Sequence, residues 1–348
     1  MQFIYLRHLL DILHMKKIAI TTLVIVSLLV AAELILRVSG GHPAHWEDKL
    51  DVIKITPGEF FKIDKVLGWK VCPGHYFFTF GNEPPFFECR MSADNERFTP
   101  GDTSTLSGRK KIFLYGGSSI LGFYLSDTEH LGYCLQQILP QYKVKNKAGF
   151  DYSMIQRYLA LKKSVSEGDT PSVAILNYRP LNDWFSPYGY NACRIFRYEM
   201  DQAHFTGYTY PYISSDTVAY LAYSDFPKDW PLRNRSVLVD CLNTYYDKNH
   251  DDKVIPLLHH NSIIALKLFS DYCLRHKIKL ILSGIDPNTE KELAALPGIN
   301  AEMVDYPVNL ADTAYNCQTK YKEPHIPNGR ANKLFAEKLA AYIQKGKK

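Results

Sequence analysis

An apolar run near the N-terminus is the strongest pattern in the sequence. Residues 18–32 carry no charged side chain, and Glu33 alone interrupts the apolar character up to residue 36. A span of this length is close to the roughly 20 residues that cross the hydrocarbon core of a bilayer. Lys16 and Lys17 precede the run, so the positive-inside rule places the N-terminus in the cytoplasm. The pattern therefore predicts a single-pass anchor over residues 18–36, with the main domain periplasmic or extracellular.

The same run also fits a cleaved signal peptide. A start at Met15, two lysines, the apolar stretch and the small residues 30–32 match the regions of such a peptide, with cleavage after Ala32. Apolar residues continue at positions 34–36, beyond that cleavage point, which favours the uncleaved anchor. Both alternatives predict that the main part of the chain is exported.

Beyond this run, short apolar segments alternate with amphipathic ones. The predicted strands cover residues 112–115, a segment from 144, 173–176 and 279–282. The predicted helices cover about 129–139, a segment through 156–161, about 262–276 with Asn261 or Ser262 as the cap, and about 330–343. Strands that alternate with helices predict a parallel sheet covered on both faces.

The pattern divides the chain into three parts. Residues 1–37 form the cytoplasmic tail and anchor, or the signal peptide from Met15. Residues 38–106 have little periodicity and are interpreted as a stalk that becomes a β-rich lead-in. Residues 107–348 carry the alternating pattern, with an insertion at about 185–258 that is rich in tyrosine, aspartate and proline.

Composition and charge narrow the function classes. With 46% hydrophobic and 22% charged residues, the chain is neither disordered nor fibrous. The net charge of +5 is mild and no large block of lysine and arginine occurs, so nucleic acid is not an expected partner.

Seven cysteines fit an exported domain with one or two disulfides and at least one free thiol. Cys72 and Cys89 flank an aromatic stretch that contains a turn, so a bridge across a hairpin is an expectation. Cys134 and Cys273 fall in apolar helical patterns and are expected in the core. There is no CxxC pair and no Cys/His cluster, so no metal site is expected.

Ser118 lies between Gly117 and Ser119, directly after a predicted buried strand. Glycines at such a turn let the backbone turn tightly and expose a hydroxyl beside free amide donors. This geometry presents a serine nucleophile, which also needs a base and an oxyanion pocket. The alternative is a turn serine that caps the following helix.

A second segment with candidate catalytic residues lies far downstream in the sequence. His325 stands in a turn rich in proline and glycine, with Glu323 two residues earlier and an amphipathic helix after it. A histidine held by a short loop beside a carboxylate fits a general base. The alternative is a histidine on the surface.

Taken in order, these segments resemble the SGNH/GDSL hydrolase family, specifically its membrane-anchored bacterial members. The resemblance covers roughly residues 110–185 and 275–345, with weaker echoes in residues 30–75. The echoes are Glu33-Leu34-Ile35-Leu36-Arg37, Leu67-Gly68-Trp69 and Pro73-Gly74. The four blocks fall on residues 115–122 (the GGS variant of the first block), 146–153, 180–183 and 323–329.

The resemblance implies a three-layer α/β/α sandwich of the flavodoxin-like type. It implies that Ser118 is the nucleophile, that His325 is the base and that Glu323 orients it. The oxyanion would be held in the turn of Gly117 and Ser118, by the backbone of Gly149 to Asp151, and by the Asn182 side-chain amide. No metal and no organic cofactor would take part.

Three residues depart from the family pattern. Asp151 occupies the position of the oxyanion-hole glycine, with Gly149 as the substitute if the chain shifts. Pro180 replaces the glycine of the third block, and Lys322 stands where the family acid is usual. Asp305 and Asp312 are further candidates for the acid.

The implied function is a serine ester hydrolase or O-acyltransferase. Its substrate would be an acylated, for example O-acetylated, cell-envelope glycan or lipid, and its partners other envelope biosynthesis proteins. The alternative is an inactive envelope protein of the same fold that binds glycan or a partner enzyme. Asp151 and Lys322 favour that alternative.

Overall fold

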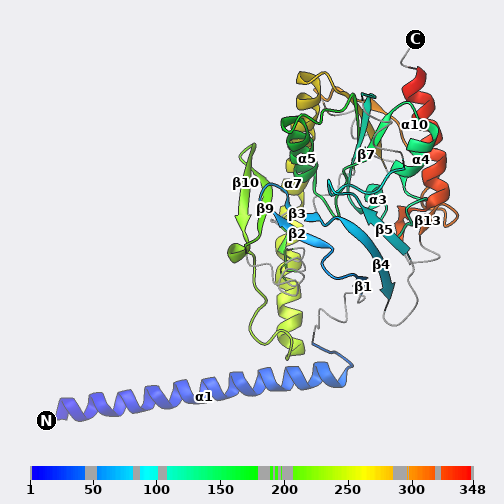
Figure 1. The fold of residues 1–348 in the computed structure, drawn as a ribbon. Helices are drawn as coiled ribbons and strands as arrows, with labels where there is room; N and C mark the ends of the chain where they lie inside the picture. The colour runs from blue at the N-terminus through cyan, green and yellow to red at the C-terminus, as the bar shows by residue number, and fades with distance from the viewer. Residues whose placement is uncertain are drawn as a thin grey trace. The chain divides into compact units, whose positions relative to one another are not determined.

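The computed structural model describes residues 2–43, 53–80, 87–100, 108–178, 207–284, 298–317 and 323–345, together with residues 189, 190, 193, 194, 197 and 296 (Figure 1). For residues 2–13, 53, 54, 80 and 323–325 it describes the backbone alone. The chain forms two units, one of Met1–Leu50 with Lys228–His250 and one of Asp51–Pro227 with Asp251–Lys348.

The second unit contains a parallel sheet of five strands. They are β6 (Lys111–Tyr115), β7 (Lys143–Asn146), β8 (Val173–Tyr178), β11 (Lys279–Gly284) and β12 (Glu302–Met303). Their spatial order is β7-β6-β8-β11-β12, and each neighbouring pair is parallel. Numbered in chain order this is 2-1-3-4-5, an order in which ligands bind at the carboxyl ends of the strands between the first and third. The predicted α/β class and its four strands are confirmed.

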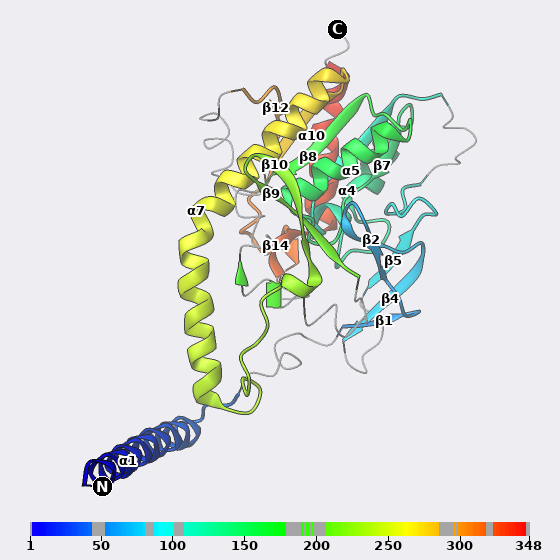
Figure 2. The ribbon, with the colours of Figure 1, turned by 90° about the vertical axis from the view of Figure 1, so that its left-hand side faces the viewer.

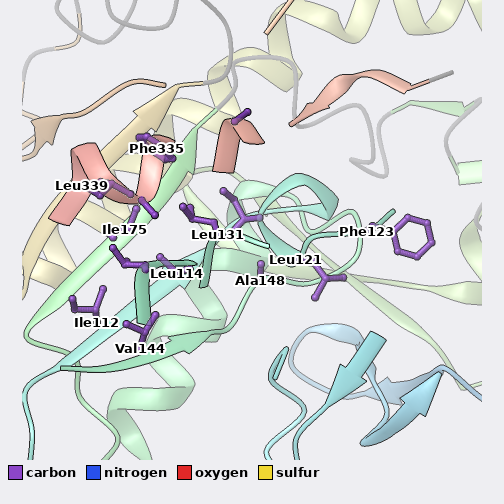
Figure 3. Packing of buried hydrophobic residues seen from close by; sticks show 14 of the residues in the cluster. Ile112, Leu114, Leu121, Phe123, Leu131, Val144, Ala148, Ile175, Phe335 and Leu339 are labelled. Atoms are coloured by element: carbon purple, nitrogen blue, oxygen red, sulfur yellow. The ribbon is translucent and has the colours of Figure 1, made fainter. Parts of the chain in front are cut away.

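Helices cover both faces of this sheet. On one face, α4 (Leu131–Ile138) and α10 (Gly329–Lys345) pack against alternate strand residues such as Ile112 and Leu114 (Figure 3). On the other face, α5 (Met154–Ser166) and the second half of α7 (Val237–Arg275) pack against Phe113 and Tyr115. Because successive strand side chains point to opposite faces, strands buried on both faces read as continuous apolar runs.

Residues 53–80 and 87–91 contain strands that pair antiparallel. Strands β1 (Ile53–Thr56), β4 (Gly74–Phe80) and β5 (Phe87–Met91) make one sheet, and β2 (Phe61–Asp64) pairs with β3 (Gly68–Val71). Phe60, Phe78 and Phe87 are buried, and the rings of the last two stack at 4.2 Å between centroids. Trp69 Nε1–H donates to the Phe150 carbonyl at 2.9 Å, so this region braces the loop that follows β7.

The predicted hairpin disulfide is wrong. All seven cysteines are free thiols, and the register explains why Cys72 and Cys89 do not meet. Cys89 lies opposite Tyr76 in the β4–β5 pair, and Gly74 lies opposite Met91. Cys72 therefore lies beyond the end of the paired hairpin, outside the reach of Cys89.

The predicted start of the helix at residue 262 is also wrong. Helix α7 begins at Val237 and is 39 residues long, so Asn261 and Ser262 lie inside it (Figure 2). The sequence before it forms the hairpin of β9 (Thr209–Ser214) and β10 (Thr217–Ala222), followed by the short 3₁₀ helix η2 (Tyr223–Asp225). The early turns of α7 bury Asn243 and Asp247 and expose Leu242 and Tyr245, the reverse of the usual pattern beside water.

The first unit contains α1 (Gln2–Val38). Its part His14–Val38 is long and apolar enough to cross a membrane, a length and composition that a signal sequence shares. The side chains of this part are largely exposed, as an apolar helix requires if lipid surrounds it.

Candidate active site at the end of strand β6

In the turn after β6 the backbone of Gly116 lies close to the side chain of Ile120. Strand β6 ends at Tyr115, and the short helix α3 (Ser118–Leu121) follows after two glycines. A Cβ atom on Gly116 would lie 2.5 Å from Cγ1 of Ile120, so only glycine lets the chain enter α3 at this point. The sequence therefore brings Ser118 to the carboxyl end of the strand that separates β7 from β8.

The Ser118 hydroxyl is held by Asp151. Ser118 Oγ–H donates to Asp151 Oδ1 at 2.5 Å, and the Asp151 N–H donates to Ser118 Oγ at 3.3 Å. Both residues are partly exposed. Asp151 has φ +49°, in the left-handed region that aspartate tolerates better than most residues. Because β6 and β7 are parallel neighbours, the turn after β6 and the loop after β7 meet at the same edge of the sheet.

Glycine also shapes the loop that carries Asp151. The Gly149 N–H donates to the Gly116 carbonyl at 3.2 Å, and a Cβ on Gly149 would lie 2.3 Å from the Tyr152 ring. Tyr152 in turn donates through its hydroxyl to the Trp69 carbonyl at 2.8 Å. The loop is therefore held against both the turn and the antiparallel region, with Gly149 buried behind Asp151.

Arg157 lies beneath the turn and was not recognised as a site residue from the sequence. Its side chain is 2% exposed, and Nη2 lies 3.2 Å from the position of a Cβ on Gly117. Nη1 donates to the Asn177 carbonyl at 2.6 Å, and Nε donates to the Tyr152 carbonyl at 3.0 Å. The guanidinium thus links the end of β8 to the loop after β7 and adds a positive charge beside the nucleophile turn. The sequence signal for this role was an arginine among the apolar residues at the start of a predicted helix.

His130 packs against Gly122 at the end of α3, and both of its ring nitrogens are hydrogen-bonded. A Cβ on Gly122 would lie 2.4 Å from the His130 Cβ. The Tyr133 N–H donates to Nδ1 at 3.3 Å, which leaves Nε2–H to donate to the Phe98 carbonyl at 2.7 Å. Burial, together with the charge of Arg97, holds the pKa of His130 well below its usual value, so the ring stays neutral.

The segment of His325 forms a strand beside α3, the helix that begins at Ser118. Strand β14 (Glu323–Pro327) pairs with β13 (Asn316–Cys317) and contacts α3. The structure thus brings the backbone that carries His325 and Glu323 next to the helix that carries Ser118. The side chains of both residues lie outside the described part, and Asn182 lies outside the described residues altogether.

The described geometry fixes the Ser118 hydroxyl from two sides: the Asp151 carboxylate accepts its proton in a hydrogen bond, and the Asp151 N–H donates to its oxygen. Among the described residues no group of three histidine, cysteine, aspartate or glutamate side chains is placed to hold a metal ion. Comparisons with protein-family models and with curated protein sequences gave no match to this chain.

Proposed function

We propose that the protein is a serine ester hydrolase or O-acyltransferase of the SGNH type, attached to a membrane by α1. The observation that carries the proposal is the pair of hydrogen bonds between Ser118 Oγ and Asp151 at the carboxyl end of β6. That place is where parallel sheets of this strand order bind ligands. The contact between β14 and α3 supports the proposal further, because it places the backbone of Glu323–Pro327 beside the helix that carries Ser118.

In the proposed reaction, Ser118 Oγ attacks the acyl carbonyl of the ester while His325 takes its proton. The Asp151 N–H, the Ser118 N–H and the Asn182 amide stabilise the oxyanion. Collapse breaks the C–O bond, and the proton on His325 passes to the leaving alkoxide. His325 then deprotonates water or an acceptor hydroxyl, which attacks the acyl-serine, and returns this proton to Ser118 Oγ as the acyl–serine bond breaks.

Asp151 decides between this proposal and a second one. Its carboxylate accepts the Ser118 proton in a hydrogen bond of 2.5 Å, the position a histidine nitrogen takes in an active triad. Catalysis requires Ser118 to exchange this partner for His325 when substrate binds. If the exchange does not occur, the protein is an inactive relative that binds a glycan or a partner enzyme.

The substrate and the location extend the proposal. We infer an acylated envelope glycan or lipid, with α1 uncleaved, the N-terminus cytoplasmic and the second unit on the outer side. The two lysines before the apolar run support this orientation.

Ester turnover by the full chain in detergent micelles tests the proposal. With an activated acetate ester as substrate, Ser118→Ala is expected to lower kcat/KM by about 10³-fold or more, because the nucleophile is lost. Ser119→Ala is the matched control and should retain turnover. His325→Asn should lower kcat with little change in KM. Turnover that survives Ser118→Ala would contradict the mechanism, and absence of turnover in the unmodified chain would favour the binding protein.

A further inference from the structure

The first turns of α7 have an inverted distribution of polar and apolar residues. Asn243 and Asp247 are 0% and 3% exposed, whereas Leu242 and Tyr245 expose 46% and 71% of their surface. Burial of polar groups opposite exposed large apolar ones is unusual for a helix that faces water. This region belongs to the first unit, the one that also contains α1.

The loop before α7 satisfies the buried polar face. Arg233 Nε donates to Asp240 Oδ1 at 2.9 Å. Asn243 accepts from the Trp230 N–H at 3.0 Å and donates to Asp247 Oδ2 at 2.9 Å. Because these bonds hold the loop on one side of the helix, the opposite side is left to the apolar side chains.

That opposite side is a continuous stripe. Leu238, Leu242 and Tyr245 recur at the i, i+4 and i+7 positions, which share one face of a helix. Tyr246, one turn after Leu242, packs against Trp230 with ring centroids 5.6 Å apart, and the two side chains expose 46% and 38% of their surface. Residues 230–246 are called the interface segment below.

Hydrogen bonds join the start of α7 to the end of the apolar run of α1. Glu33 is the first charged residue after that run, and its carboxylate accepts from Ser236 Oγ at 2.8 Å. It also accepts from the N–H groups of Val237 and Leu238 at 3.1 and 2.9 Å. These bonds cap the positive end of α7 and place its first turn beside the last turns of α1 (Figures 1 and 2).

We propose that the interface segment inserts its apolar stripe and Trp230 into the headgroup layer of the bilayer that α1 enters. The occupant of this face follows from continuity, because Glu33 lies in the last two turns of the apolar part of α1, His14–Val38. Tryptophan and tyrosine are the residues enriched in the headgroup layer, and helices with one apolar face lie in it. The proposal is independent of the chemistry at Ser118.

Quenching by brominated lipid tests the proposal on the full chain. The protein is reconstituted in vesicles of phosphatidylcholine and phosphatidylglycerol, and the Trp230 signal is taken as the difference between the chain and its Trp230→Phe variant. Lipids brominated on the upper acyl chain are expected to quench about half or more of this signal, because the ring sits at the interface. An unquenched difference signal overturns the proposal.

Two variants sharpen the result. Leu242→Asp is expected to reduce the quenching of Trp230, whereas Thr244→Asp, an equal charge at an exposed position outside the stripe, is expected to leave it unchanged. A second copy of the chain is the competing occupant, and the exposed thiol of Cys241 reports on it. Oxidative dimers through Cys241 in the vesicles, together with an unquenched Trp230, would show that a protein surface covers the stripe instead.

Discussion

The turn at Ser118 and the first turns of α7 differ in which side chains face outward. At Ser118 the polar groups follow the ends of apolar strands, so the core is apolar and the partly exposed Ser118 and Asp151 lie at the edge of the sheet. In α7, Asn243 and Asp247 are buried and the apolar stripe faces outward. The first pattern is stable beside water and the second beside lipid. Burial must therefore be read against the surrounding medium.

The largest expected effect comes from Arg157, the charge buried under the Ser118 turn. Arg157→Met leaves the Tyr152 and Asn177 carbonyls without their donor and is expected to cost about 2–4 kcal/mol of unfolding free energy. Chemical denaturation of the full chain in micelles measures it. Arg275→Met, at an exposed position, is the control and should change little. Equal stability of the two variants would contradict the role given to Arg157.

The next effect tests the close approach at the turn. Gly116→Ala places a methyl group 2.5 Å from Ile120 and is expected to cost about 1–3 kcal/mol by overpacking. At Gly58 a Cβ would meet no atom within 4 Å, so Gly58→Ala should be close to neutral. Thermal unfolding of both variants gives the comparison. A neutral Gly116→Ala would show that the turn relaxes more freely than the geometry implies.

A smaller effect tests the inverted packing of α7. Asn243→Leu removes the acceptor of the Trp230 N–H and is expected to cost about 1–2 kcal/mol locally. Amide hydrogen exchange over residues 228–250 reports this loss as faster exchange. Thr244→Leu, at an exposed neighbouring position, should leave exchange unchanged. Faster exchange in both variants would argue against the polar network as its cause.

The smallest effect concerns Asp169, a carboxylate that pairs with lysine side chains. Burial alone would raise the pKa of Asp169, but hydrogen bonds from Lys111 and Lys145 and the charge of Lys147 lower it below 3.8. A carboxylate whose pKa is lower in the folded than in the unfolded chain stabilises the fold at pH values above its unfolded-state pKa. This stabilisation is lost as the pH falls through the folded-state pKa. Asp169→Asn should therefore be destabilising near pH 6, with the difference from the unmodified chain shrinking below about pH 4. A difference independent of pH in denaturation curves would contradict this.

Much of the fold could be predicted because the strands of the parallel sheet are buried on both faces. The runs at 112–115, 173–176 and 279–282 became β6, β8 and β11, and the order of the strands brought Ser118 to Asp151. The start of α7 was not predicted, because its few apolar residues at helical spacing lie in an insertion rich in tyrosine, aspartate and proline. The predicted Cys72–Cys89 disulfide was wrong because the strand register, and not the distance along the sequence, determines which residues of a hairpin face each other.

The candidate site was predictable only in part. A GGS turn after a strand indicates an exposed hydroxyl, but the residues around the turn do not show which side chain accepts a hydrogen bond from that hydroxyl. The resemblance to the SGNH/GDSL family puts Asp151 at the position of the oxyanion-hole glycine, where it departs from the family pattern. The sequence did not show that its carboxylate and its N–H both contact Ser118 Oγ. Arg157 was missed because its role depends on carbonyls that come from two separate segments. The roles of His325, Glu323 and Asn182 stay predictions.

Covalent labelling tests the central claim most directly. The full chain in micelles is treated with a fluorophosphonate probe, and the modified peptide is identified by mass spectrometry. The account predicts one adduct, on Ser118, that is absent in Ser118→Ala and in heat-denatured protein and is retained in Ser119→Ala. An unlabelled Ser118 in a folded chain would contradict an activated serine and make Asp151 the residue that silences it.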